Sequence, residues 1–517
     1  MKKWQVLFGI VATAGAVVSL AQLGTAQSGL TDISLALNIA NPESPIPAAN
    51  WDTWTTIKDK IGVNIKFTSL PAAADGDTKL GALAAANDLP DLFEVRNPNL
   101  FDRLVQQGQL ASVSSITALM PRRNAMRYTD RKRNALATVN GVQYGFQEPA
   151  SLSRQYAISI RKDWLEKLGL KAPTTLEEFY EVAKAFTERD PDGNGKKDTY
   201  GYGGVIDYDT AGVLPGLGLG NHFQWIYGAY SVAGTWNYKA KSFNANVKDP
   251  NYRKATEYIA KLVSNKLIDP DWATMKRADL RTRWQQGRYG MFYESVGGLQ
   301  SGIRNFDGNN KKAELMFIAP PKGPSGKAVP GIYANAGWLF VVSKKALDAG
   351  KGPAIAKFLE FANYNEGYYL LGFGKRGVHY NLVDNIPVAN LAASAAERGM
   401  YTQLKWLALN SNPGELKARY AIFTTAEKQA TYNFYEMLLD AQNNGWVDRT
   451  GDIAIRAASN QADIERYVAE NMVQFALGQR PINDGNWDQF LNGLNGLNFE
   501  QYENNAEKVL KTGGFLR

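Results

Sequence analysis

The chain has 517 residues, of which 58 are Lys or Arg, 50 are Asp or Glu, two are His and none is Cys. The absence of Cys excludes disulfides, thiolate metal sites, iron–sulfur clusters and Cys nucleophiles. His222 and His379 are too few for a His-rich zinc site, and a Ser–His triad would have to use one of them. A hydrophobic share of 44% and a charged share of 21% are typical of a globular protein long enough for two or more domains.

The first 26 residues have the features of a secretory signal peptide. Lys2 and Lys3 precede an apolar stretch over residues 6–18, and the small residues Gly24-Thr25-Ala26 suit cleavage before Gln27. A membrane anchor is the alternative, but the stretch is shorter than the roughly 20 residues that span a bilayer. We therefore expect export to the periplasm or the extracellular space. Because no Cys follows the cleavage site, we expect no lipid anchor attached through Cys.

After this segment, β-type and helical patterns alternate. Residues 33–39, 63–67 and 92–95 are short runs typical of strands. Apolar residues at 51, 54, 57 and 61 recur at spacings of three and four, which predicts a helix over residues 51–61. Further helices are predicted after the second and third strands. This βαβαβα order predicts an α/β fold with a mainly parallel sheet covered by helices.

Two later regions bear on domain organisation and on partners. A strand at 157–160 followed by a helix predicts a first crossing between lobes near residue 150, and isolated strands within 313–372 indicate a return to the first lobe. Residues 122–133 contain six basic residues and one acidic residue. No nucleic-acid-binding motif accompanies them, so a solvated helix face is favoured over a nucleic-acid patch or an anion-attracting rim. We expect no nucleic-acid partner.

The most specific local motif is the loop from Asp190 to Asp198. Its positions 1, 3, 5 and 9 carry side-chain oxygens, and position 7 offers a carbonyl; these residues are Asp190, Asp192, Asn194, Asp198 and Lys196. Ca²⁺ prefers six to eight oxygen ligands, and the glycine at position 6 permits a sharp turn around one ion. The bidentate Glu of an EF-hand is missing at position 12. A plain Asx/Gly turn is the alternative, but the spacing favours a structural Ca²⁺ site.

Three segments together closely resemble the family 1 extracellular solute-binding proteins, the ligand-capturing subunits of ABC importers. These segments are residues 160–170, residues 173–180 with a predicted capping box of Thr175 and Glu178, and the Asp190 loop. Apolar residues at 176, 179, 182, 183 and 186 predict a buried stripe on the helix that the capping box starts. Weaker similarities extend over nearly the whole chain. The subgroup that it resembles most includes alginate-oligosaccharide-binding proteins and related lipoproteins. Thr199 departs from that subgroup, in which another carboxylate commonly follows the last Asp of the loop.

The resemblance implies a two-lobed periplasmic-binding-protein-like fold of type II, with a mixed sheet flanked by helices in each lobe and a hinge cleft between the lobes. It implies that the lobes close on a sugar and that Ca²⁺ binds at the Asp190 loop. The partners implied are an oligosaccharide and the permease of an ABC transporter, with the protein itself a monomer. The division that we expect is a signal peptide over 1–26, lobe 1 over 27–150 and 313–372, and lobe 2 over 151–312 and 373–517.

Sugars stack their C–H faces on aromatic rings and pair their hydroxyls with polar groups, and uronic acids add a carboxylate that Arg binds bidentately. In parallel sheets ligands bind beyond the strand carboxyl ends, which nominates the loops at 40–50 and 94–99. The candidate ligand-binding residues are Glu94, Arg96, Asn97, Gln147, Trp225, Tyr227, Glu294, Trp338 and Trp406. Core packing is an equally good account of each aromatic residue. For any single polar residue, an ordinary solvated loop is the better-supported alternative.

A secreted polysaccharide lyase or glycoside hydrolase is the main alternative function. Such an enzyme would also be exported, rich in aromatic residues and calcium-bound, and Glu94 and Glu294 are eligible as the two carboxylates that hydrolysis needs. The alternation of elements and the family resemblance favour a binding protein without catalysis, both over an enzyme and over a wall-bound adhesin. The sequence leaves open which sugar is bound and whether that sugar is acidic.

Overall fold

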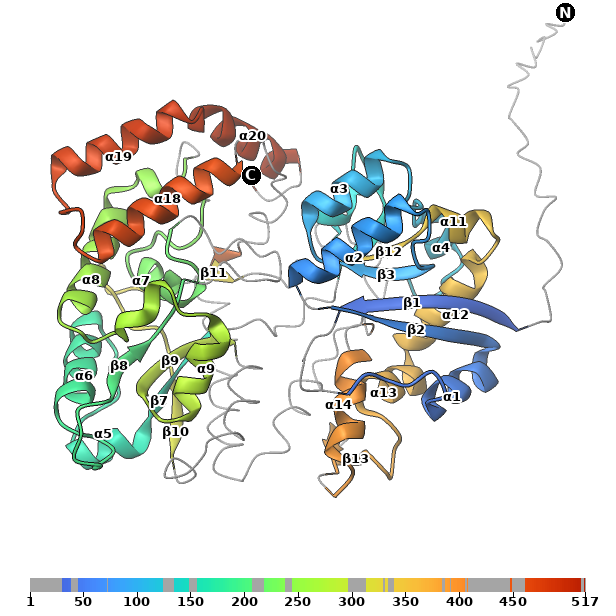
Figure 1. The fold of residues 1–517 in the computed structure, drawn as a ribbon, viewed down its shortest axis with the longest axis horizontal. Coiled ribbons are helices and arrows are strands. Elements are labelled where there is room, and N and C mark those ends of the chain that lie inside the picture. Colours follow the sequence, from blue (N-terminus) through green and yellow to red (C-terminus); the bar gives the residue numbers. More distant parts are fainter. Residues whose placement is uncertain are drawn as a thin grey trace, which may run out of the picture.

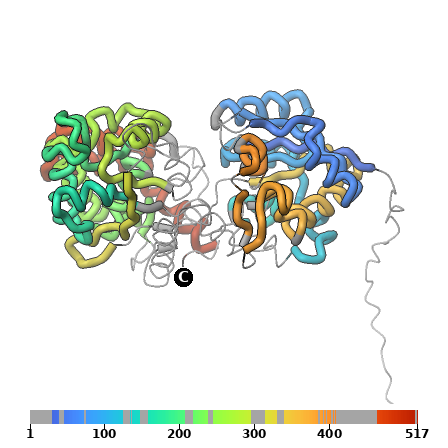
Figure 2. The backbone as a smooth tube through the Cα atoms, turned by 90° about the horizontal axis from the view of Figure 1, so that it is seen from below, coloured from blue at the N-terminus to red at the C-terminus, as the bar shows by residue number. Residues whose placement is uncertain are grey.

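A computed structural model describes residues 30–38, 45–71, 73–123, 134–147, 156–206, 218–237, 244–295, 313–328, 331–332, 339–383, 386–390, 392–404, 407, 447–448, 461–512 and 516. The predicted signal peptide over 1–26 lies outside these residues. They form two α/β bodies that stand side by side in Figure 1 and, after a quarter turn, in Figure 2. Each body has its own sheet and its own hydrophobic core, which confirms the predicted two-lobed α/β fold.

The sheet of the first body has five strands in the order β2-β1-β3-β12-β6. Their bounds are β1 Thr31–Asn38, β2 Val63–Leu70, β3 Leu92–Val95, β12 Leu339–Val342 and β6 Gly145–Gln147. Strand β1 pairs in parallel with β2 and β3, as predicted, whereas β12 runs antiparallel to β3 and β6. Every residue of β3 and β12 is buried, because helices cover both faces of the sheet.

Alternating side chains of this sheet enter two core clusters, one on each face. Leu35 belongs to the cluster with α1 and α12, whereas Ala36 belongs to the cluster with α2 and α3. The helices of this body are α1 Asp52–Ile61, α2 Ala73–Ala85, α3 Pro98–Gln106, α4 Ser114–Ala118, α11 Lys344–Asp348, α12 Gly352–Ala362, α13 Asn365–Phe373 and α14 Ala395–Leu404.

The sheet of the second body has four strands in the order β10-β7-β9-β8. Their bounds are β7 Tyr156–Arg161, β8 Tyr200–Gly203, β9 Tyr289–Ser295 and β10 Leu315–Ile318. Strand β8 is parallel to β9, whereas β7 is antiparallel to β9 and β10. The helices of this body are α5 Lys162–Leu168, α6 Leu176–Glu188, α7 Gln224–Ala229, α8 Pro250–Ser264, α9 Arg277–Gln285, α18 Gln461–Ala476, α19 Asp484–Gly496 and α20 Phe499–Thr512.

Helix α6 begins and packs as the sequence predicts. The Thr175 hydroxyl accepts a hydrogen bond from the Glu178 backbone N at 3.2 Å, and the Glu178 carboxylate accepts one from the Thr175 backbone N at 3.2 Å. This reciprocal capping box is confirmed. The predicted apolar stripe is buried against the sheet of the second body and consists of Leu176, Phe179, Val182, Ala183 and Phe186.

The structure corrects the predicted lobe boundaries at two places. Strand β10 pairs with β7, so residues 315–318 belong to the second body and not to lobe 1. Leu404 and Leu407, which were assigned to lobe 2, pack in the core of the first body with helix α12. Both errors have the same cause, because strand pairing and helix packing across long stretches of chain leave no local sequence signal. Val509 of α20 packs against a core cluster of each body.

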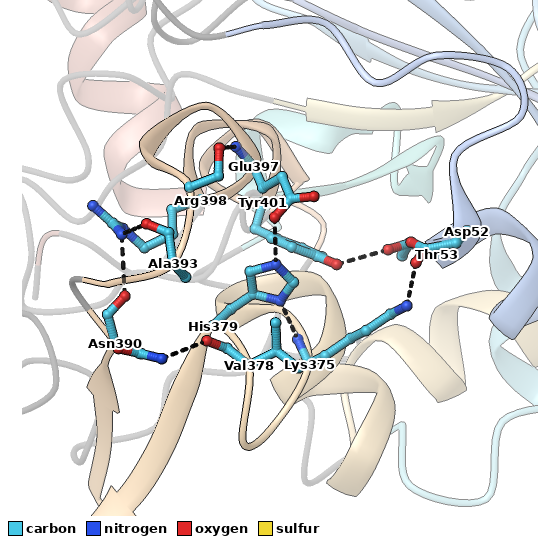
Figure 3. Close-up of polar contacts among 11 residues, drawn as sticks. Asp52, Thr53, Lys375, Val378, His379, Asn390, Ala393, Glu397, Arg398 and Tyr401 are labelled. Carbon is cyan, nitrogen blue, oxygen red and sulfur yellow. Dashed lines mark hydrogen bonds and ion pairs between the residues drawn. The ribbon is translucent and has the colours of Figure 1, made fainter.

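A side-chain network attaches helix α14 to the start of α1, as Figure 3 shows. The Tyr401 and Thr53 hydroxyls are 2.8 Å apart, and Lys375 pairs with Asp52. His379 accepts a hydrogen bond from the Lys375 backbone N through Nδ1 at 3.0 Å, and its Nε2 lies 3.2 Å from the Glu397 carboxylate. These contacts hold helix α14 and residues 375–379 against the start of α1.

Three two-stranded sheets complete the part of the fold that the structure describes. They pair β4 Thr138–Val139 with β5 Val142–Gln143, β11 Gly331–Ile332 with β15 Val447–Asp448, and β13 Tyr380–Val383 with β14 Ile386–Ala389. Among the helices in the described ranges, none combines the length and the apolar character needed to cross a membrane.

Candidate functional site

Strand connectivity places the carboxyl end of β3 in the first sheet, and that of β9 in the second sheet, on the side that faces the other body. We call these two sides, where the strands end, the facing edges. Val95 at the end of β3 lies opposite Leu339, and Leu339 lies opposite Gln147 at the end of β6. In the second sheet, Ser295 at the end of β9 lies opposite Tyr156 at the start of β7. Only residues 148–155 separate Gln147 in one sheet from Tyr156 in the other, so the paired strand ends around Gln147 and Tyr156 lie on the sides of the two sheets that this part of the chain joins.

Glu94 is the central polar residue on the edge of the first body. It is 1% exposed, and its carboxylate accepts a hydrogen bond from the Asn38 backbone N at 3.0 Å and pairs with the Arg96 guanidinium. A buried carboxylate is tolerated only with such partners. The Asn97 side-chain oxygen accepts hydrogen bonds from the backbone N of Asn99 and Leu100, at 2.9 and 3.2 Å, as the N-cap of α3. Glu94 and Arg96 therefore lie together, and Asn97 starts a helix beside them.

Two polar residues that sequence reasoning missed, Asn38 and Asp77, lie at the same edge. Asn38 is 2% exposed, and neither atom of its amide has a hydrogen-bond partner among the residues that the structure describes. The backbone at Gly76 comes so close that a Cβ atom there would lie 2.3 Å from the Asn38 Oδ1. Burial raises the pKa of Asp77, against the effect of its hydrogen bond with Asn97. A polar residue directly after the apolar run Leu35–Leu37 of β1 was the available signal for Asn38.

Glu294 is the corresponding residue on the edge of the second body. It is fully buried near the end of β9 and pairs with two arginines of α9, Arg277 and Arg281. Burial alone would raise the pKa of the Glu294 carboxyl, but the two guanidinium charges overcome it and lower this pKa well below its usual range. The sequence identified Glu294 but missed both arginines, because the register between α9 and β9 decides which side chains meet.

The predicted aromatic ligand residues Trp225 and Tyr227 lie in the core, which corrects their assignment. Both are 0% exposed on helix α7. The Trp225 indole N–H donates to the Tyr202 hydroxyl at 3.0 Å, and its ring lies 4.7 Å from that of Phe179. The Tyr227 hydroxyl lies 3.2 Å from that of Thr256. A ring enclosed in this way offers no face to a ligand.

Three further predicted residues have no described side chain. Gln147 lies in strand β6, at the facing edge of the first sheet, but only its backbone is described. Trp338 and Trp406 lie outside the described residues.

The Asp190 loop lies on the second body between α6 and β8. The Asp190 carboxylate accepts hydrogen bonds from the backbone N atoms of Gly193, Asn194 and Gly195 at 3.0–3.1 Å. The Asn194 amide nitrogen donates to Asp192 at 2.8 Å and to Asp198 at 3.2 Å. In the part of the chain that the structure describes, no group of three or more His, Asp or Glu side chains is placed so that it could hold a metal ion.

Comparison with known proteins identifies the family. The sequence profile of the family described as bacterial extracellular solute-binding protein matches residues 48–368, more than half of the chain. The chain belongs to this family. The match covers most of the first body and the sheet of the second body, including both facing strand ends.

Several relatives of this solute-binding protein have been characterised or solved. It is 28% identical to the polygalacturonan/rhamnogalacturonan-binding protein YtcQ of Bacillus subtilis over 410 residues, 73% of this chain and 74% of that protein. The structure of FusA of Streptococcus pneumoniae in complex with kestose has a TM-score of 0.69 and 17% identity, over 93% of this chain and 99% of FusA. Alginate-binding protein AlgQ2 has a TM-score of 0.66 and 17% identity, over 94% and 98% of the two chains. These structural likenesses show a common fold.

The structure thus divides the predicted site residues of this solute-binding protein whose side chains are described into two groups. Glu94, Arg96 and Glu294 lie at the two facing edges, and Asn97 lies beside the first. Trp225 and Tyr227 belong to the core. The first body thus brings Glu94, Arg96 and the Asn38 amide together, and the second body brings Glu294 together with Arg277 and Arg281. Both Glu94 and Glu294 are paired with arginine.

Proposed function

We propose that this protein is exported, binds an oligosaccharide between its two bodies and delivers it unaltered to the permease of an ABC importer. The observation that carries the proposal is the family match over residues 48–368 together with the polar groups on the facing edges of both sheets. A ligand that contacts both edges stabilises the state in which the bodies are close, so binding is coupled to hinge closure. The protein acts as a monomer.

The class of ligand is supported by the names of the relatives and by the chemistry of the edge. YtcQ is named for binding polygalacturonan and rhamnogalacturonan, FusA was solved with kestose, and AlgQ2 is named for binding alginate. The buried Asn38 amide, with two unused donors and one unused acceptor among described neighbours, suits a sugar hydroxyl. An unpaired buried amide costs free energy that such a hydrogen bond would recover.

We also propose that the Asp190 loop binds Ca²⁺ as a structural ion. Partial burial and the neighbouring Asp190 carboxylate raise the pKa of Asp192, so two carboxylates lie close together with unfavourable mutual repulsion. A divalent cation would relieve this repulsion. The residues that would bind it are Asp190, Asp192, Asn194, Asp198 and the Lys196 carbonyl. Related structures are described as an EF-hand mutant of FusA and as AlgQ2 without calcium ion.

Thermal melting in the presence of neutral and uronate oligosaccharides tests the main proposal. We expect at least one oligosaccharide to raise the melting temperature, with a dissociation constant in the micromolar range or tighter by calorimetry. Small-angle scattering should show a smaller radius of gyration for the complex. Identical scattering curves with and without a tight-binding sugar would rule out closure.

A secreted polysaccharide lyase or glycoside hydrolase is the competing function. Glu94 and Glu294 were eligible as its carboxylates, but each is paired with arginine, which favours binding over proton transfer. Chromatography of the sugar after prolonged incubation separates the two functions. Shortened products would identify an enzyme and contradict the proposal.

A further inference from the structure

The two arginines around Glu294 form an asymmetric arrangement. Arg277 binds the carboxylate as a fork through Nε, at 3.2 Å from Oε2, and through Nη2 to Oε1. Arg281 lies one helical turn later on α9 and donates only its Nε, at 2.9 Å from Oε2. One fork already satisfies the charge of a buried carboxylate. Within this described group of one carboxylate and two guanidiniums, the second guanidinium therefore leaves an excess of one positive charge.

Arg281 is placed to bind a second carboxylate. Its side chain is 41% exposed, compared with 22% for Arg277, and Glu294 is its only acidic partner among the residues described. Glu294 fixes the Nε side of the Arg281 guanidinium, which leaves the Nη edge available to an acceptor outside the protein. A planar guanidinium edge with two parallel N–H groups matches the two oxygens of a carboxylate.

Among the residues that the structure describes, the edge of the first body shows no such excess. There one arginine, Arg96, faces one glutamate, Glu94, and Asp77 adds a further acidic group nearby. An anionic group on a ligand between the bodies would therefore be attracted to the second body and not to the first.

We propose that Arg281, positioned by Glu294 and supported by Arg277, binds the carboxylate of a uronic acid, so that the ligand of this protein is an acidic oligosaccharide. This inference rests on the proposed function and narrows its ligand class. It assigns Arg281 as the residue that discriminates acidic from neutral sugars, and Glu294 and Arg277 as positioning residues.

The test compares Arg281→Gln with Arg288→Gln as a matched control. Arg288 is exposed and lies immediately before the opposite end of β9, so its substitution removes the same charge away from the facing edge. The probes are trigalacturonate and the neutral α-1,4-galactotriose, titrated by calorimetry at low salt. Arg281→Gln leaves the Arg277 fork on Glu294, and its melting curve checks that the second body is folded.

We expect the unmodified protein to bind trigalacturonate at least tenfold more tightly than galactotriose. Arg281→Gln should lower the affinity for trigalacturonate about 10- to 100-fold, the range of a hydrogen-bonded charge pair, and change that for galactotriose less than about threefold. Arg281→Lys should retain part of the preference, because it keeps the charge and loses the planar edge. Arg288→Gln should change neither affinity.

Four results would overturn the inference. The first is equal binding of both sugars by the unmodified protein, and the second is an equal effect of Arg281→Gln and Arg288→Gln. The third is binding of galactotriose but not trigalacturonate, which would leave the proposed function intact. If neither trisaccharide binds, the acidic-ligand inference is wrong, and the wider oligosaccharide panel then decides the proposed function separately.

Discussion

Substitution of Trp225 tests whether this residue stabilises the fold or contacts the ligand. The side chain is 0% exposed, lies 4.7 Å from the Phe179 ring and donates a hydrogen bond to Tyr202. Removing a buried tryptophan side chain costs about 3–5 kcal/mol of unfolding free energy. With a slope of about 2 kcal/mol per molar urea, Trp225→Ala should lower the unfolding midpoint of the second body by roughly 2 M. Trp225→Phe keeps most of the ring packing but loses the N–H hydrogen bond, so it should cost only about 1–2 kcal/mol.

Urea unfolding followed by far-UV circular dichroism measures these effects. The two bodies have separate cores, so the transition of the first body serves as an internal control and should not move. Below the transition, Trp225→Phe should bind oligosaccharide within about threefold of the unmodified protein. The reasoning is refuted if Trp225→Ala unfolds at the original midpoint and loses ligand affinity instead.

Three further predictions concern the backbone, pH and metal. Gly374 has a φ of 93° and a ψ of −153°, where a Cβ atom would lie 2.7 Å from Tyr401, so Gly374→Ala should destabilise the first body by at least about 2 kcal/mol in urea. The control Gly377→Ala, with a φ of 81° and no atom within 4 Å of its Cβ, should cost about 1 kcal/mol; equal losses would contradict the packing argument. The pKa of Glu294 is lowered in the folded state, so its stabilisation is present above its unfolded pKa near 4.5 and is lost as pH falls towards the lower folded pKa. Below pH 4.5 the unfolding free energy of the unmodified protein should therefore fall with pH, and Glu294 should contribute up to about 1.4 kcal/mol per pH unit to this fall. Glu294→Gln should lack that contribution, and the same slope in both proteins would exclude the ion pair. Addition of EDTA should lower the melting temperature of the unmodified protein but not of Asp192→Asn, and an unchanged melting temperature would remove the calcium proposal.

Local patterns in the sequence predicted local structure well. The capping box at Thr175 and the buried stripe after it depend on residues three and four positions apart, and the structure has both. The parallel order of β1, β2 and β3 likewise follows from the alternation of strands and helices, and it placed Glu94 correctly at a strand end. These features needed no information from distant parts of the chain.

Features that depend on distant pairing were not predictable in the same way. Strand β10 was assigned to the wrong body because its partner β7 lies far away in the sequence. Trp225 follows a glycine-rich stretch typical of a loop, yet tertiary packing encloses it completely. Arg281 reaches Glu294 only because α9 packs against the end of β9, a register that no spacing within either element reveals.

Native mass spectrometry with an oligosaccharide of defined length tests the central claim most directly. If the two bodies enclose a sugar and release it whole, the spectrum shows one complex whose mass is that of the protein plus one intact oligosaccharide, unchanged over hours. A complex that carries shortened fragments, or the absence of any complex across neutral and acidic oligosaccharides, would contradict the account.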